Sequence, residues 1–167
     1  MKVTPVALLG FCFALGCSRP EVHLIPAGYK GDVAILAGYR MGVPPRRDGL
    51  SIVFEVPRGG ILVTQDQPGS GWHTARYFYV DDAGRRQRLQ EEYSTVQDTP
   101  ANRADTTPIV AMITGTGEQR GVDIPCTIYA ATYYVGTRAD LLSRSIDQAN
   151  AQRRRIEELV RRDRTCR

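Results

Sequence analysis

The sequence has few of the side chains on which most active sites depend. Only two of its 167 residues are histidines, His23 and His73, and they are far apart in the chain. Metal sites usually combine several clustered histidine, cysteine or carboxylate ligands, and the sequence has no cluster with that spacing. Its serines also lack the setting of a nucleophile elbow. We therefore predict no metal, no cofactor and no enzymatic activity.

A nucleotide-binding fingerprint is also missing, although glycines cluster in "GTGEQRG" at residues 115–121. A dinucleotide-binding loop needs a third glycine where this stretch has Arg120, and it needs a helix afterwards. Pro125 and a second β-rich segment follow instead. The stretch therefore predicts a hairpin loop between two strands.

Long apolar runs are absent after the first 16 residues, so the sequence predicts no membrane-spanning helix. Residues 1–16 combine a positive charge at Lys2, a short apolar run and a small residue just before a cysteine. This arrangement is typical of a cleaved signal peptide. The chain is therefore predicted to be exported.

The end of this leader, "ALGC" at residues 14–17, resembles a bacterial lipobox, in which the leader is removed and the cysteine is diacylated. We predict that residues 1–16 are a lipoprotein signal peptide and that Cys17 is lipidated. Two acyl chains together hold a protein stably on a membrane. Ser18, in place of aspartate, indicates the outer membrane facing the periplasm if the host is a diderm. The alternative is an ordinary secretory leader that ends near a cysteine.

The four cysteines divide between the leader and the exported part. Cys12 falls in the leader and Cys17 carries the predicted lipid, which leaves Cys126 and Cys166. A pair of cysteines in an exported protein indicates a disulfide bond. This bond would close a loop of about 40 residues and contribute about 4 kcal/mol on a chain-entropy estimate. Two unpaired thiols are the alternative.

Positive charge is concentrated at the C-terminus. From Arg138 onward there are nine arginines against five acids, whereas residues 17–137 carry 12 basic and 13 acidic side chains. The arginines of "RRRIEELVRR" alternate with acids and have no aromatic neighbours, which argues against nucleic-acid binding. We predict no nucleic-acid partner. A solvated helix face and a contact with anionic lipid are the two interpretations that remain.

Short β-rich segments follow the leader. Alternation in "LSIVFEVP" places Ile52 and Phe54 on one face, and alternation in "ARYFYV" does the same for Tyr77 and Tyr79. After a lipidated tether over residues 17–21, we predict a mainly β domain. It is a β-sandwich, of prealbumin or immunoglobulin type, with about seven to eight strands.

The β domain is predicted to cover residues 22–136, and the pattern then changes. Thr137 and Asp140 have the spacing of a capping box. Apolar residues then recur at helical spacing, at Leu142, Ile146, Ala149, Ile156 and Val160. We predict one C-terminal amphipathic α-helix over residues 137–167, packed on the domain.

Several stretches together resemble a family of bacterial lipoprotein domains of unknown function. They are "IPAGYKGDV" and "GGILVTQ", which are the most specific, with "FYVDDAGRRQRL" and, much later, "YYVGT". The resemblance covers residues 22–92 and 133–137. It implies an envelope location and a small β-rich fold, and it transfers no catalytic residue.

The stretch "QDQPGSGWHTARYFY" contains the single tryptophan of the chain. Aromatic residues on loops are frequent contact sites, so Gln65, Trp72 and His73 form a candidate contact surface; a tryptophan in the core is the alternative. We predict a non-enzymatic envelope lipoprotein, anchored to the membrane through Cys17, that binds or supports an unknown envelope protein or ligand. The alternative function is a small periplasmic hydrolase that uses His73.

Overall fold

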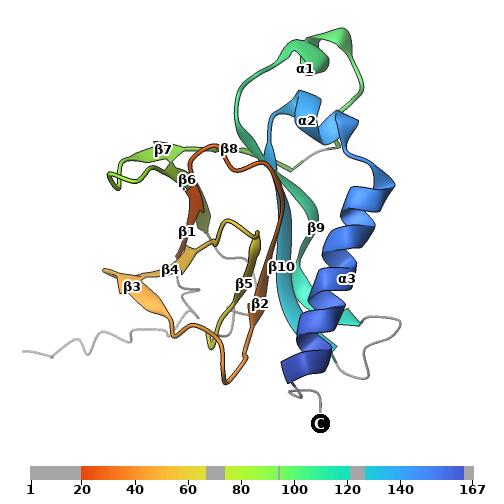
Figure 1. Cartoon of the computed structure of the whole chain (residues 1–167). Coiled ribbons are helices and arrows are strands. Elements are labelled where there is room, and N and C mark those ends of the chain that lie inside the picture. Colours follow the sequence, from red (N-terminus) through yellow and green to blue (C-terminus); the bar gives the residue numbers. More distant parts are fainter. Residues whose placement is uncertain (1–19, 67–73, 94, 121–126, 164–167) are drawn as a thin grey trace, which may run out of the picture.

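The computed structural model describes residues 20–66, 74–93, 95–120 and 127–163. These residues form two five-stranded β-sheets that face each other, with a long helix on the outer side of the second sheet (Figure 1). The first sheet has the strand order β3-β4-β1-β6-β7, and the second has the order β5-β2-β10-β9-β8. The predicted mainly β, sandwich-like fold with a C-terminal helical segment is confirmed.

The elements have the following bounds. The first sheet contains β1 (Glu21–Pro26), β3 (Arg46–Asp48), β4 (Ser51–Glu55), β6 (Ala75–Val80) and β7 (Arg86–Arg88). The second sheet contains β2 (Gly31–Ala37), β5 (Ile61–Val63), β8 (Gln90–Glu92), β9 (Ile109–Arg120) and β10 (Thr127–Gly136). The helices are α1 (Pro100–Ala104), α2 (Arg138–Ser143) and α3 (Ile146–Asp163).

Both sheets mix parallel and antiparallel neighbours. β1 lies at the centre of the first sheet and runs parallel to both β4 and β6. In the second sheet β10 is antiparallel to β2 and β9, while the edge strands β5 and β8 run parallel to their neighbours. Immunoglobulin sandwiches have antiparallel sheets, so the two-layer architecture agrees with that comparison and the strand pairing differs from it.

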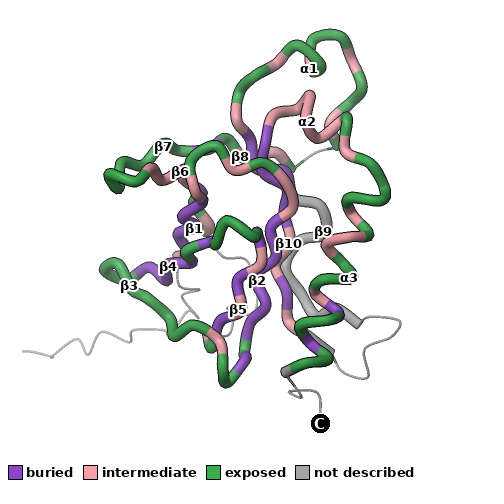
Figure 2. Tube along the Cα trace, in the orientation of Figure 1, coloured by how far each residue is buried: buried purple, intermediate pink, exposed green. Residues whose placement is uncertain are grey.

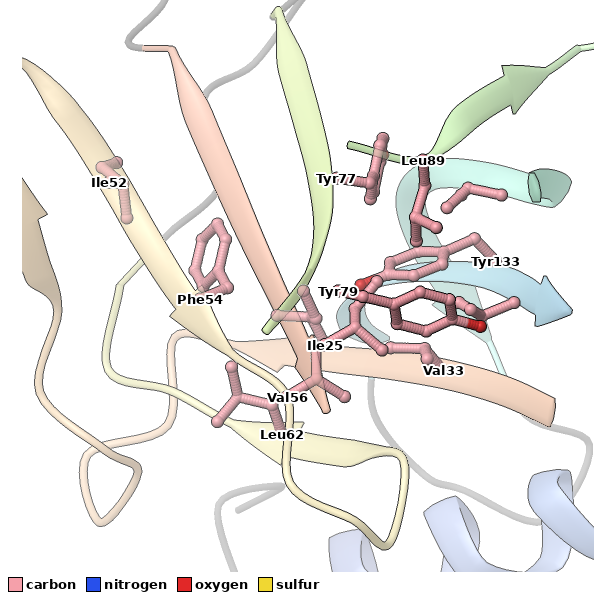
Figure 3. Packing of buried hydrophobic residues seen from close by; sticks show 13 residues of the cluster. Ile25, Val33, Ile52, Phe54, Val56, Leu62, Tyr77, Tyr79, Leu89 and Tyr133 are labelled. Atoms are coloured by element: carbon pink, nitrogen blue, oxygen red, sulfur yellow. The ribbon is translucent and has the colours of Figure 1, made fainter. Parts of the chain in front are cut away.

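The main core lies between the sheets and is built from the faces that alternation predicts. Phe54 on β4 and Tyr77 and Tyr79 on β6 all point into it, together with Tyr133 from β10 (Figure 3). Figure 2 shows that the buried positions are concentrated along the central strands of both sheets. Full burial of each large apolar side chain contributes about 1.5–3 kcal/mol, so this layer is the main source of stability.

The described residues form ten strands, more than the seven to eight predicted. The edge strands β3, β7 and β8 have three residues each, with the sequences RRD, RQR and QEE. Segments that are so short and charged show no alternation, so only their pairing defines them. β9 also continues to Arg120 through most of the glycine-rich stretch that we predicted as a loop. β9 and β10 pair antiparallel, as the two strands of the predicted hairpin, up to Arg120 and Thr127.

The C-terminal segment forms two helices where one was predicted. The capping box is confirmed: Asp140 N donates to Thr137 Oγ1 at 3.1 Å, and Thr137 N donates to Asp140 Oδ2 at 3.0 Å. α2 ends where the backbone of Arg144 becomes extended. A second cap then starts α3, because Ser145 N donates to Gln148 Oε1 and Gln148 N donates to Ser145 Oγ.

α3 packs the predicted apolar stripe onto the outer face of the second sheet. Val160 is buried there with Leu36 and Ala130, and Ile156 packs beside them. Ile146 was predicted to belong to this stripe and is instead 79% exposed, because it lies in the first turn directly after the break. Within the described ranges, no helix is both long and apolar enough to cross a membrane.

Candidate functional site

Most residues predicted to be functional lie outside the described part of the chain. They are Cys17, Trp72, His73, Cys126 and Cys166. The lipid anchor, the disulfide, the contact surface around the tryptophan and the hydrolase hypothesis therefore stay predictions.

Gln65 and His23 are described, and each supports the local structure. Gln65 is exposed, and its Nε2 donates to the carbonyl oxygen of Arg40 at 3.0 Å. His23 is 1% exposed between the sheets, with Nδ1 3.0 Å from Tyr133 Oη and Nε2 3.3 Å from Glu21 Oε2. Burial raises the pKa of Tyr133 well above its ordinary value, so its hydroxyl keeps its proton. This network ties β1 to β10 through the core.

A polar cleft opens where the start of β2 meets α2 and α3. We call it the Asp32 cleft. It has a volume of about 440 Å³ and is lined by Tyr29, Lys30, Gly31, Asp32, Tyr134, Asp140, Ser143, Arg144, Gln148, Ala151, Gln152 and Arg155. Three of these residues are cations and two are carboxylates, so the cleft suits a polar ligand.

A buried ion pair forms one wall of the Asp32 cleft. Oδ2 of Asp32 accepts hydrogen bonds from Arg144 Nε at 3.1 Å and from Arg144 Nη2 at 2.7 Å. The side chains of Arg144 and Asp32 are only 19% and 8% exposed. The pair fastens the break between α2 and α3 to the beginning of β2, so it sets the position of both helices relative to the second sheet.

A second ion pair lies at the rim. Lys30 Nζ is 2.9 Å from Asp140 Oδ2, and Asp140 also caps α2. Partial burial opposes ionisation of Asp140, but hydrogen bonds from Lys30 and Thr137 outweigh it and lower the pKa of this carboxyl. Tyr134 lies beside these groups, and burial together with the nearby carboxylates raises its pKa to about 12. Near neutral pH the carboxyl is therefore ionised and the phenol is protonated.

Two residues that line the Asp32 cleft each have a buried polar atom without a hydrogen bond. Within the part of the chain that the structure describes, neither Oδ1 of Asp32 nor the side-chain nitrogen of Gln152 has a partner. A buried polar group without a partner costs about 1–3 kcal/mol, so such atoms usually bind water or a ligand. One is an acceptor and the other a donor, so a ligand that pairs with both needs a donor for Asp32 and an acceptor for Gln152.

Tyr29 supports the cleft through contacts with neighbouring segments, and we call this group of contacts the corner around Tyr29. Its hydroxyl donates to the carbonyl oxygen of Asp32 at 2.7 Å, and its own carbonyl accepts from Tyr79 Oη at 2.7 Å. Gly60 packs directly against this corner with φ of +76°. A side chain there would collide with Tyr29 and with the backbone of Asp32. Burial is the main reason that the pKa of Tyr29 is raised.

The stretches that carry the family resemblance meet at this corner. "IPAGYKGDV" supplies Tyr29 and Asp32, while Gly60 comes from "GGILVTQ". Tyr79 comes from "FYVDDAGRRQRL" and Tyr134 from "YYVGT". Segments that are far apart in the sequence therefore build one structural unit, with the Asp32 cleft at its surface.

The sequence patterns did not predict this cleft. Asp32 begins an apolar strand, and its partner Arg144 lies 112 positions later, so no local pattern joins them. One signal was available, because Ser145 and Gln148 have the spacing of a second capping box and mark the helix break. Among the described residues, no group of three or more histidine, cysteine or carboxylate side chains is placed to hold a metal ion.

Comparisons with known proteins agree with this architecture. Residues 18–121 match the model of a family described as "Family of unknown function (DUF6843)". A crystal structure called "Putative Lipoprotein from Bacillus anthracis" superposes with a TM-score of 0.59 at 16% identity, over 87% of this chain and 94% of that chain. At this identity the likeness shows a common fold. No curated protein matches the chain.

Proposed function

The chain belongs to the DUF6843 family, whose function is unknown, and we propose that this protein is a lipid-anchored module of the bacterial cell envelope that binds a polar ligand without chemically changing it. The anchor is Cys17 and the binding site is the Asp32 cleft. The observation that carries the binding proposal is the unmatched acceptor and donor, on Asp32 and Gln152, that line one cleft.

Three observations support the anchor. The leader ends in a sequence that resembles a lipobox, β1 begins at Glu21, four positions after Cys17, and a protein of the same fold is called a lipoprotein. Acylation at Cys17 would therefore hold the domain beside the bilayer on a very short tether. In a diderm host, Ser18 directs it to the outer membrane, facing the periplasm.

The chain direction places the Asp32 cleft away from that tether. β1 runs from Glu21 to Pro26, and β2 begins at Gly31 on the far side of the intervening turn. A six-residue strand spans about 20 Å. Lys30 and Asp32 are therefore one strand length from the anchored end, where they would face the envelope space and a ligand.

The charges of the cleft favour binding over catalysis. General acid–base catalysis works best with a group whose pKa lies near the working pH. Asp140 has its pKa lowered and is paired with Lys30, and Asp32 is held by Arg144. Both carboxylates thus form ion pairs with cationic side chains, which supports a non-enzymatic role.

The fold also supports the proposed disulfide between Cys126 and Cys166. β10 begins at Thr127, directly after the first cysteine, and α3 ends at Asp163, three positions before the second. Val160 near the end of α3 packs against Ala130 near the start of β10. The two elements therefore bring the chain on both sides of the proposed bond into the same region.

The anchor is tested by replacing Cys17 with serine. We expect the parent protein, expressed in a bacterium, to have the mass of a chain that begins at an acylated Cys17 and to fractionate with membranes. Cys17→Ser should remove the lipid mass and lower the fraction of the protein that sediments with membranes, because the acyl chains are the proposed anchor. Cys12→Ser is the control and should leave both properties unchanged. A parent protein without acyl mass would contradict the proposal.

The cleft is tested by replacing Gln152 with leucine, which keeps the size of the side chain and removes its donor. An amide is the simplest group that offers a donor to Asp32 and an acceptor to Gln152, so the probes are N-acetyl amino-acid amides with neutral and acidic side chains. We expect chemical-shift changes around the cleft, and a Kd that rises about five- to tenfold in Gln152→Leu, as for one lost hydrogen bond.

Gln87→Leu is the matched control, because Gln87 is exposed on β7 outside the cleft. This control should bind the probes as the parent does. Equal affinity of the parent and Gln152→Leu would contradict the assignment of the site.

A further inference from the structure

The end of the sandwich at which the tether enters is defined by the chain direction. Pro20 precedes β1, and its carbonyl oxygen accepts a hydrogen bond from Ile52 N near the start of β4. β1 and β2 are joined by a turn at the opposite end, so the loop after β2 returns to the end where Pro20 lies. Figure 1 shows that α3 also ends beside this loop. We call this region the tether end.

The tether end concentrates exposed apolar side chains. Six large apolar side chains are exposed among the described residues, from 37% for Leu159 to 86% for Leu50. Four of them lie here: Met41 and Val43 in the loop after β2, Leu50 in the turn before β4, and Leu159 near the end of α3. Met41 borders two apolar hollows of about 410 and 330 Å³. Apolar patches of this kind mark contact sites.

The loop that carries Met41 and Val43 is held in place. Val43 N donates to the carbonyl oxygen of Val63 at 2.8 Å, and Gln65 N donates to the carbonyl oxygen of Val43 at 3.0 Å. Gly42 between the two apolar residues lies against the Thr64 backbone so closely that a Cβ would be 2.6 Å from the carbonyl carbon. The apolar side chains are therefore presented outward by a loop that is fixed to the sheet.

The short tether decides what this surface meets. Glu21 is four positions after Cys17, and even a fully extended chain spans only about 14 Å between them. If Cys17 is acylated, the tether end therefore stays at the bilayer surface. Arg40 stands beside Met41, and Arg162 lines the hollow next to Leu159. Arginine side chains next to apolar residues can reach lipid phosphates while the apolar groups enter the interface.

We propose that the tether end rests on the membrane, with Met41 and Val43 inserted among the lipid headgroups. This inference rests on the proposed lipid anchor and adds an orientation: one end of the sandwich contacts the bilayer, and the Asp32 cleft points away from it. The bilayer is the partner because the patch, the tether and the nearby arginines are on the same end of the molecule.

The test uses the full-length acylated protein in vesicles of phosphatidylethanolamine and phosphatidylglycerol. Trp72→Phe removes the native tryptophan, and Met41→Trp adds one at the tether end. Ile146→Trp in the same background is the matched control, because Ile146 is also 79% exposed but lies at the opposite end, at the start of α3. Lipids with brominated acyl chains quench tryptophan only on close approach.

We expect the Met41→Trp protein to show blue-shifted emission and about threefold stronger quenching than the Ile146→Trp protein, as for a residue at the headgroup boundary. Equal quenching of two proteins that both float with the vesicles would overturn the orientation and leave the anchor intact. A blue shift of Met41→Trp that depends on protein concentration without vesicles would overturn it in favour of a second copy. A parent protein that carries no acyl chains after expression and fails to float would overturn both the anchor and the orientation.

Discussion

Arg144→Met is expected to lower the free energy of unfolding by about 3 kcal/mol, since loss of one partner leaves the other charge buried and uncompensated. Arg144 supplies both hydrogen bonds to Asp32 Oδ2, at 3.1 and 2.7 Å. The carboxylate that remains has a side chain only 8% exposed. Urea denaturation of the variant and the parent measures the difference from the shift of the midpoint.

Two further variants separate this effect from a general loss of charge. Arg85→Met removes a pair with Asp81 at a comparable 2.7 Å, but the Arg85 side chain is 84% exposed, and exposed pairs contribute only about 0–1 kcal/mol. The double variant Asp32→Leu/Arg144→Met should recover much of the lost stability, because it leaves no isolated charge. If Arg144→Met and Arg85→Met had equal effects, the buried pair would not be what fastens the helices to β2.

Gly60→Ala is expected to destabilise the protein by about 3 kcal/mol, from the left-handed backbone conformation and from overpacking. The residue has φ of +76°, and its Cβ would meet the Tyr29 hydroxyl and lie 2.6 Å from the carbonyl oxygen of Asp32. Because Tyr29 positions Asp32, the variant should also disturb the Asp32 cleft. Urea denaturation measures the first effect, and chemical shifts of residues around the cleft report the second.

Gly28→Ala is the matched control for the collision. Gly28 has nearly the same φ, +74°, but a methyl group added there would have no other atom within 4 Å beyond its chain neighbours. Only the backbone cost of about 1 kcal/mol should remain, and the chemical shifts of the cleft should be unchanged. If the Gly60→Ala protein were as stable as the Gly28→Ala protein, the contacts around Tyr29 would rearrange without loss of stability, and the predicted effect of the collision would be wrong.

Structural features that depend on residues a few positions apart could be predicted from the sequence. Alternation predicted that Tyr77 and Tyr79 share one face of their strand, as Phe54 does with Ile52, and the structure places these shared faces in the core between the sheets. The spacing of Thr137 and Asp140 predicted the first helix cap, which is also present. These features depend on neighbours within a few positions, so the local sequence contains nearly all of the information that determines them.

The helix break shows where local patterns stop being sufficient. The apolar stripe continues at helical spacing across Arg144, so periodicity alone predicts one helix. The chain instead turns at this residue, where the guanidinium group donates hydrogen bonds to Asp32 on β2. The three-residue edge strand β3 escaped prediction for a similar reason, since its charged residues become a strand only by pairing with β4.

The sequence by itself determined which strand residues share a face, the first helix cap and the family resemblance, because each of these depends on residues that are close together in the sequence. Only the tertiary structure decided the location of the Asp32 cleft and the burial of His23. Asp32 meets Arg144 across 112 positions, and His23 meets Tyr133 across 110. Contacts at such separations depend on the order and direction of strands in two sheets, which no local pattern of side chains specifies.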